Sequence, residues 1–172
     1  MSALNDESLQ QLAAQVGAAL AERDMMLASA ESCTGGWLGQ VITSVAGSSA
    51  WYERGFITYT YISKREMLGV SGATLEQHGA VSEQTAKEMV LGALARSHAQ
   101  MAVAITGIAG PNGGTAEKPV GMVCFAWAMK DGLARSETRH FTGDREAVRR
   151  QSVVLALQGV SDLLHGVAPA TA

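Results

Sequence analysis

The stretch MMLASAESCTGGWLGQVITSV, residues 25–45, places an apolar strand pattern directly before a helix pattern. The run from Met25 to Ala30 has no polar alternation, which is typical of a strand covered on both faces. From Trp37 to Val45 the apolar residues recur at helical spacing. Between the two runs lie hydroxyl and thiol side chains and two glycines, so backbone N–H groups and the positive end of a helix dipole can face an anion or oxyanion. We therefore expect a functional site at this junction.

The rest of the chain continues to alternate helix and strand patterns. Helices are predicted to begin near residues 5–6, 34, 63, 82 and 144, and strands to occupy 25–30, 55–61, 101–106, 120–129 and 133–141. Side-chain alternation along 55–61 would place Tyr59 and Tyr61 on one face, and 70–81 is expected to be irregular with a helical turn around Leu75. Alternating elements up to residue 106, followed by a hairpin, predict an α/β fold: a three-layer α/β/α sandwich with a mixed, mostly parallel sheet.

Size and composition fit one domain. A chain of 172 residues buries roughly 70% of its unfolded surface, enough for a core without disulfides or metals. Because no repeat or linker interrupts it, we expect a single domain over residues 1–167 and a disordered tail at 168–172. The apolar surface available around Trp51, Tyr52 and Phe56 leads us to expect a homo-oligomer, a dimer or higher.

Charge and cysteine content restrict the partners. The net charge is −3, and the basic cluster Arg149-Arg150 with Arg145 nearby is too small for a nucleic-acid footprint. The acidic N-terminal segment lacks an uninterrupted apolar run, so no signal peptide or membrane span is predicted. Cys33 and Cys124 have no Cys or His at ligand spacing. We therefore expect a cytoplasmic protein that binds no nucleic acid or membrane and uses neither a metal nor another cofactor.

Ser32 is the leading candidate nucleophile. It lies where a helix N-terminus can stabilise the oxyanion formed when a carbonyl is attacked. A serine at such a junction is more often a helix cap, so the local sequence alone favours the structural interpretation. Two common serine templates also fail, because residue 30 is not the glycine of a nucleophile elbow and Gly35 stands where S-x-x-K has its lysine.

A serine hydroxyl needs a base, and none of the four histidines lies in a triad motif. Lys64 is a better candidate, since desolvation can make a lysine neutral, although its position alone favours a solvated lysine in the first turn of a helix. Tyr59 can relay a proton or be a core aromatic with its hydroxyl at the rim. Cys33 is a second candidate, because a thiolate at a helix N-terminus has a lowered pKa, but its side chain can equally point into the core, and without an evident His or Asn partner it ranks below Ser32.

Three further features can bind an anion. The segment 107–114 is rich in glycine, but it lacks the Gly-Lys-Ser/Thr ending and the following helix of a nucleotide P-loop. A second small-residue turn is formed by Gly47, Ser48 and Ser49. Arg145, in the first turn of the last helix, is either a solvated helix charge or an anion clamp.

Seven separated motifs resemble the CinA C-terminal domain family, in the same order and across nearly the whole chain. They are AESCTGG at 30–36, VAGSS at 45–49, GFITY at 55–59 with Lys64, HGAVS at 78–82, TGIAGPNGG at 106–114, KPVG at 118–121 and GDR at 143–145. Many members of that family hydrolyse the carboxamide of nicotinamide mononucleotide to nicotinate mononucleotide and ammonia. The resemblance implies a three-layer α/β/α fold, a pyridine nucleotide as substrate, and no cofactor.

By motif, the resemblance assigns catalysis to Ser32, Lys64 and Tyr59. Lys64 would take the proton of Ser32, backbone amides after Ser32 would receive the oxyanion, and Tyr59 would orient Lys64 or pass the proton to ammonia. Where the substrate's phosphate binds stays open among a helix N-terminus, the 47–49 turn, the 107–114 loop and Arg145. The expected substrate-binding residues are Cys33, Thr34, Gly35, Gly47, Ser48, Ser49, Thr106, Gly107, Gly110 and Arg145.

The chain departs from the family pattern at residues 60–63. The family commonly has Ser-Asn after the tyrosine, whereas here Thr60 and Tyr61 follow it, so a phenol replaces a small amide. If Tyr61 blocks the pocket, the chain would be a non-catalytic module that binds a nucleotide or a protein; a third possibility is hydrolysis of a different small amide. The family domain often follows a larger N-terminal domain, and we expect this chain to be the stand-alone form.

Overall fold

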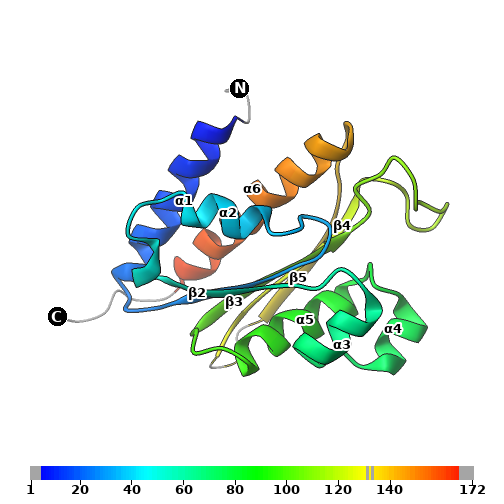
Figure 1. The fold of residues 1–172 in the computed structure, drawn as a ribbon, viewed down its shortest axis with the longest axis horizontal. Coiled ribbons are helices and arrows are strands. Elements are labelled where there is room, and N and C mark those ends of the chain that lie inside the picture. Colours follow the sequence, from blue (N-terminus) through cyan, green and yellow to red (C-terminus); the bar gives the residue numbers. More distant parts are fainter. Residues whose placement is uncertain (1–4, 131, 133, 167–172) are drawn as a thin grey trace.

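The computed structural model describes residues 5–130, 132 and 134–166, so the predicted tail at 168–172 lies outside the described residues. Helices and strands alternate through most of the chain (Figure 1). In order, the elements are α1 (Asp6–Ala21), β1 (Leu27–Glu31), α2 (Trp37–Thr43), a 3-10 turn η1 (Ser48–Ala50), β2 (Tyr52–Ile57), α3 (Tyr61–Leu68), α4 (Gly72–His78), α5 (Glu83–Ala95), β3 (Met101–Gly107), β4 (Met122–Met129), β5 (Ala134–His140) and α6 (Arg145–Leu164).

The strands form one mixed sheet in the order β2-β1-β3-β4-β5. β1 pairs in parallel with both β2 and β3, whereas β4 is antiparallel to its neighbours β3 and β5. Four of the five strands therefore run in one direction, and β4 alone runs the other way. The carboxyl ends of β2, β1 and β3 lie at the same edge of the sheet, which is where open α/β sheets usually place their sites.

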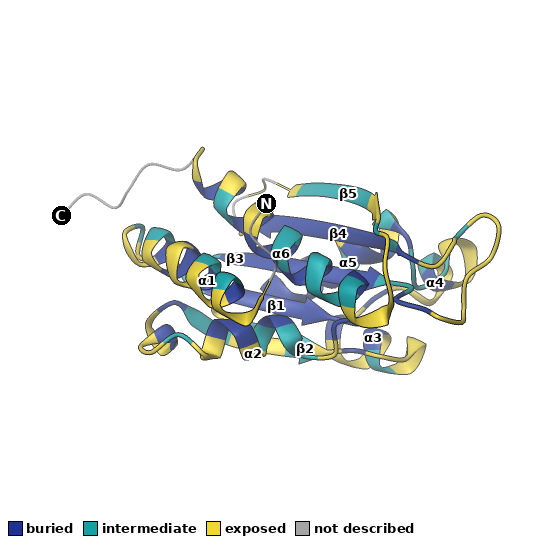
Figure 2. Ribbon diagram, turned by 90° about the horizontal axis from the view of Figure 1, so that it is seen from above, coloured by how far each residue is buried: buried dark blue, intermediate teal, exposed yellow. Residues whose placement is uncertain are grey.

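Helices cover both faces of the sheet, which confirms the three-layer prediction (Figure 1). One face carries the larger side chains of β3 and β4 and packs against α1, α2 and α6; these strand residues are Met101, Val103, Ile105, Val123, Phe125 and Trp127. The other face carries mostly alanines of the same strands and packs against α3, α4 and α5. Burying each face against a helical layer removes apolar surface from water at roughly 25 cal/mol per Å². Figure 2 shows the buried strands between helices whose outer surfaces are exposed.

The predicted strand at 55–61 is wrong in position. The observed strand β2 begins at Tyr52 and ends at Ile57, because the chain then turns away and Thr60 caps α3. Thr60 and Ser63 form a capping box, each side chain accepting a hydrogen bond from the other's backbone N–H. Tyr59 therefore lies in a loop and Tyr61 is the first residue of α3, so the two tyrosines do not share a strand face.

Two further expectations need correction. The segment 70–81 contains a complete short helix, α4, which Ser71 caps by accepting from the Ala73 N–H. Trp51 is buried in the core, whereas Tyr52 and Phe56 are half-buried, so Trp51 adds nothing to the apolar surface from which an oligomer was expected; the homo-oligomer stays a prediction. None of the helices in the described residues combines the length and apolar character needed to cross a bilayer.

Candidate active site

The candidate site lies where the three parallel strands end. Ser32 follows β1, and its backbone N–H donates to the Ile105 carbonyl of β3 at 3.0 Å. Across the other neighbour, the Thr58 N–H donates to the Glu31 carbonyl at 2.8 Å, which fixes the chain leaving β2. The loops that follow β1, β2 and β3 therefore begin side by side, and residues far apart in the sequence share one small volume.

Lys64 reaches this volume from the second turn of α3 and meets Ser32. Its Nζ lies 2.9 Å from Ser32 Oγ and 2.6 Å from the Thr58 carbonyl oxygen. The lysine is only 1% exposed, so it is not the solvated helix residue that its local sequence favours. Burial without a carboxylate partner lowers the pKa of Lys64 from 10.5 to about 8.

A neutral amine in this position can act as a base. It has two hydrogens and one lone pair, and the Thr58 carbonyl accepts one hydrogen. The lone pair can then accept the hydroxyl proton of Ser32 at the observed distance. This is the nucleophile and base pairing that hydrolytic acyl transfer requires.

Ser32 does not cap the helix that follows it. The cap of α2 is Gly36, in a left-handed conformation at φ 96° and without a side-chain bond. The buried carboxylate of Glu31 takes the free amides instead: one oxygen accepts from the Gly36 and Leu38 N–H groups at 3.0 and 3.1 Å, and the other from Gly39 at 2.9 Å. The helix N-terminus is thus already occupied, which corrects the expectation that it faces an external anion.

In the described part of the chain, the two amides that follow Ser32 differ from the later ones of the turn. Among the described residues, the backbone N–H groups of Cys33 and Thr34 donate to no other residue, whereas that of Gly35 is bound to the Ser32 carbonyl. The Cys33 thiol is no rival nucleophile, because burial raises its pKa to about 12. The Thr34 hydroxyl donates to Glu31 at 2.6 Å and takes no part in lining the site.

A cavity of about 260 Å³ opens beside Ser32 and Lys64. The end of β3, with Thr106 and Gly107, and the glycine-rich loop that follows it, with Gly110, line one part of the cavity. Arg145, at the start of α6, also lines the cavity, and its guanidinium donates to the Gly110 carbonyl of this loop at 2.8 Å. Arg145 and Lys64 are the cationic side chains of this lining.

The two tyrosines after β2 line the same cavity. The Tyr59 hydroxyl accepts from Arg145 at 3.1 Å and makes no hydrogen bond to Lys64, so the Thr58 carbonyl, not Tyr59, orients the lysine. The Tyr61 hydroxyl accepts from the Ala80 N–H at 3.3 Å. Tyr61 is half exposed and forms a wall of the cavity without filling it.

One predicted group lies elsewhere. Gly47, Ser48 and Ser49 precede β2, and the next residues join the start of β1, where the Leu27 N–H donates to the Trp51 carbonyl. This turn is therefore at the opposite end of the strands from Ser32 and does not line the cavity. Gly35 is also outside the lining.

Two functional candidates were missed. Glu31 was part of a quoted motif but received no role, because a carboxylate after an apolar strand gives no signal that it will be buried under the next helix. Arg149, on α6, is far from Ser32 in the sequence. Its guanidinium donates to the carbonyls of Cys33 and Thr34 at 3.1 and 2.9 Å. No spacing rule connects residues so far apart in the chain.

Comparison with known proteins gives one consistent result. The model of the CinA C-terminal domain matches residues 9–164. A protein named nicotinamide-nucleotide amidohydrolase PncC from Escherichia coli K12 is 54% identical over 155 residues, covering 90% of this chain and 94% of that protein. A protein of the same name from Pseudomonas putida is 49% identical over 153 residues, covering 88% and 94%.

A solved structure agrees with the sequence comparisons. The competence/damage inducible protein CihA from Agrobacterium tumefaciens superposes with a TM-score of 0.88 at 45% identity, covering 92% of this chain and 96% of that one. The match extends over the elements that carry Ser32, Lys64 and Arg145. This chain belongs to the CinA C-terminal domain family.

Proposed function

We propose that this protein is an amidohydrolase that converts nicotinamide mononucleotide to nicotinate mononucleotide and ammonia through an acyl-enzyme on Ser32. The observation that carries the proposal is the buried Lys64 amine 2.9 Å from Ser32 Oγ, inside a cavity. Close relatives that bear the name nicotinamide-nucleotide amidohydrolase support the choice of substrate.

Acylation begins with neutral Lys64. Its lone pair takes the hydroxyl proton as Ser32 Oγ forms a bond to the carboxamide carbon. The carbonyl oxygen becomes an oxyanion and is received by the amides of Cys33 and Thr34. When the tetrahedral intermediate collapses, the C–N bond breaks and the nitrogen leaves as ammonia with the proton that Lys64 held. Tyr59 remains a candidate for passing that proton, since its hydroxyl lines the same cavity.

Deacylation reverses the roles. Lys64, neutral again, takes a proton from a water molecule that attacks the ester carbon. The second tetrahedral intermediate uses the same amides and then releases the carboxylic acid as the Ser32–acyl bond breaks. Lys64 returns its proton to Ser32 Oγ, and the acid ionises and gives its proton to ammonia. One water is therefore consumed, the products are carboxylate and ammonium, and no net proton stays on the enzyme.

Arg145 is proposed to bind the phosphate of the substrate. It is the cationic lining residue that is not engaged with Ser32, and its fork of N–H groups suits phosphate oxygens. Its present partners, the Gly110 carbonyl and the Tyr59 hydroxyl, are neutral acceptors that fix the side chain without neutralising its charge.

The test is to incubate the protein with nicotinamide mononucleotide and measure ammonia and nicotinate mononucleotide. We expect stoichiometric release of both, and loss of at least about a thousandfold in kcat for Ser32→Ala. Ser49→Ala removes an exposed hydroxyl from the 47–49 turn, outside the cavity, and is expected to keep the activity of the unmodified protein.

The outcomes separate the alternatives. Nucleotide binding measured by calorimetry without turnover would select the non-catalytic module. Turnover of another pyridine carboxamide in preference to the nucleotide would select a different substrate, while leaving the role of Ser32 in place. Undiminished turnover by Ser32→Ala would contradict the proposed chemistry.

A further inference from the structure

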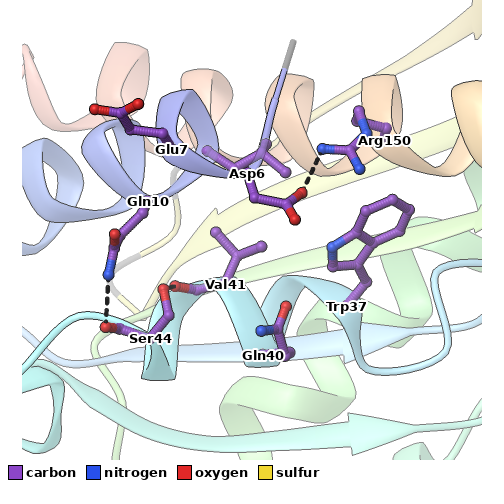
Figure 3. A pocket seen from close by; sticks show the side chains of 9 residues that line it. Asp6, Glu7, Gln10, Trp37, Gln40, Val41, Ser44 and Arg150 are labelled. Carbon is purple, nitrogen blue, oxygen red and sulfur yellow. Dashed lines mark hydrogen bonds and ion pairs between the residues drawn. The ribbon is translucent and has the colours of Figure 1, made fainter.

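Arg149 and Arg150 are neighbours on α6 that bind different partners. Both guanidinium groups lie against the Trp37 ring, 5.1 and 4.9 Å from its centre. Arg150 turns to acidic side chains, Asp6 at 2.6 Å and Glu146 at 3.1 Å, and Figure 3 shows its contact with Asp6 beside Trp37. Arg149 instead binds the turn that follows Ser32, residues 32–35. The pair therefore shares position, charge and aromatic partner but differs in its contact with that turn.

Arg149 forms two hydrogen bonds to the turn. Its Nε donates to the Cys33 carbonyl at 3.1 Å and its Nη2 to the Thr34 carbonyl at 2.9 Å. Glu31 holds the following amides from the other side. The Thr34 carbonyl also accepts from the Trp37 N–H at 3.0 Å. Within the described residues, Arg149 is the sole hydrogen-bond donor to the Cys33 carbonyl.

We propose that Arg149 is a positioning residue that directs the oxyanion-accepting amides of residues 33 and 34. The inference rests on the proposed role of Ser32 as nucleophile. It adds a residue from α6 that does not itself line the cavity and has no hydrogen bond to Ser32, but binds the backbone of the two residues that follow Ser32.

Peptide geometry transmits these two contacts to the neighbouring N–H groups. A trans peptide is planar, so its N–H points opposite to its C=O. Holding the Cys33 carbonyl therefore fixes the direction of the Thr34 N–H. Holding the Thr34 carbonyl fixes the Gly35 N–H, whose bond to the Ser32 carbonyl in turn sets the direction of the Cys33 N–H.

The electrostatic part acts in the same direction. A charged donor on a carbonyl polarises the peptide and strengthens its N–H as a donor. The positive charge also favours negative charge nearby: Arg149 acts to lower the pKa of the Cys33 thiol, although burial outweighs it. An oxyanion forming at the neighbouring residue would experience the same field.

The experiment measures how fast a fluorophosphonate labels Ser32 and needs no nucleotide turnover. In that reaction Ser32 Oγ bonds to phosphorus, fluoride leaves with the P–F electron pair, and Lys64 takes the hydroxyl proton. The phosphoryl oxygen gains negative charge as the amide carbonyl oxygen would. Labelling is followed by intact mass for the unmodified protein, Arg149→Lys, Arg149→Ala and the matched controls Arg150→Lys and Arg150→Ala.

We expect Arg149→Lys and Arg149→Ala to label about 10- to 100-fold more slowly, because a lysine cannot hold two carbonyls as a fork. The Arg150 variants should label at the unmodified rate. Added guanidinium ion should restore part of the rate to Arg149→Ala and leave Arg150→Ala unchanged, which a general loss of stability cannot produce. Melting temperatures of all variants check folding.

Three results would overturn the inference. The first is equal labelling of the Arg149 and Arg150 variants, and the second is an Arg149→Ala rate that guanidinium does not raise. Failure of Ser32 to label in the unmodified protein would also overturn it, since no amides would then be poised to receive charge. Because the assay omits the nucleotide, a protein that labels normally but does not hydrolyse nicotinamide mononucleotide contradicts the proposed substrate alone.

Discussion

The environment of Lys64 differs strongly from the one that its local sequence predicts. The segment around it predicts a solvated lysine near the start of a helix, yet the amine is buried between Ser32 Oγ and the Thr58 carbonyl. The cause is tertiary: α3 begins immediately after β2 ends, and its second turn faces the carboxyl edge of the sheet. Burial takes the amine out of water, and its two hydrogen-bond partners are neutral and do not compensate its charge, so its pKa falls.

The lowered pKa predicts the pH dependence of the reaction. If neutral Lys64 is the base, kcat/KM should rise about tenfold per pH unit below the pKa of about 8 and level off above it. Initial rates measured from about pH 6 to pH 10 test this. Lys64→Arg should be inactive throughout, because a guanidinium stays protonated. A profile that is flat through pH 8, or activity in Lys64→Arg, would mean that Lys64 only binds substrate.

The same pKa predicts a pH dependence of stability. Between the folded pKa of about 8 and the unfolded value near 10.5, the unfolded chain binds more protons, so the free energy of unfolding rises with pH across that window. The gain is at most about 3 kcal/mol for this one group. Urea denaturation at both ends of the window, compared with Lys64→Met, isolates it. If the difference between the two proteins does not change with pH, the lysine is not desolvated.

At the residue scale the sequence predicted the serine and the lysine that meet in the cavity but not the residues that support them. Ser32, Lys64 and Arg145 lie in motifs and meet at one cavity. Glu31 and Arg149 act by hydrogen bonds to backbone groups, and such contacts impose no pattern on the side chains around them. The raised pKa of the Cys33 thiol likewise depends on burial, which its neighbours in the chain do not determine.

Among the elements, α2 depends most on a single side chain. It has only seven residues, too few to be stable alone, and its N-cap is a glycine without a side chain. The Glu31 carboxylate supplies the missing acceptor for its first amides. The carboxylate thus joins β1 to α2 and fixes the turn that carries Ser32.

This arrangement predicts a graded loss of stability. Glu31→Gln keeps the shape of the side chain but replaces one accepting oxygen with an NH₂ group, which then faces an N–H donor. This change should lower the free energy of unfolding by about 2–3 kcal/mol. Thr34→Val removes one donor to the same carboxylate and should cost only about 1 kcal/mol. Thermal melts of both variants provide the comparison. A Glu31→Gln protein as stable as the unmodified one would contradict the capping role.

The accuracy of the element predictions follows the strength of the local signal. β3 and β4 are uninterrupted apolar runs, and α5 has a clear cap and stripe, so all three were predicted. β2 was displaced because its aromatic and β-branched pattern continues to Tyr61, past the last paired residue. The capping box of Thr60 and Ser63, in which Ser63 stands where glutamate or glutamine is usual, was not recognised as a helix start.

For the whole molecule, the two faces of the sheet differ in side-chain size. The α1 and α6 layer packs on bulky residues, and there glycines let aromatic rings approach a helix: Gly17 of α1 lies under Trp51, and Gly159 of α6 under Trp127. The sequence predicted the layers from the alternation of elements. It did not predict these ring contacts, since nothing near Gly17 indicates that a residue 34 positions later will cover it.

This packing can be tested by a double-mutant cycle. Gly17→Ala should lower the free energy of unfolding by about 1–3 kcal/mol, because the added methyl group collides with the Trp51 ring. In a Trp51→Leu background the same change should be neutral or stabilising, since alanine is the better helix former by about 1 kcal/mol. Additive effects in the cycle would show that Trp51 does not pack on Gly17.

The most direct measurement for the whole mechanism is detection of the acyl-enzyme. The protein is mixed with excess nicotinamide mononucleotide, quenched with acid within the first turnover, and examined by mass spectrometry with fragmentation that separates Ser32 from Cys33. We predict an added mass equal to the nucleotide minus ammonia, located on Ser32 and absent from Ser32→Ala. Turnover with no adduct on Ser32, together with an undiminished rate in Ser32→Ala, would contradict it.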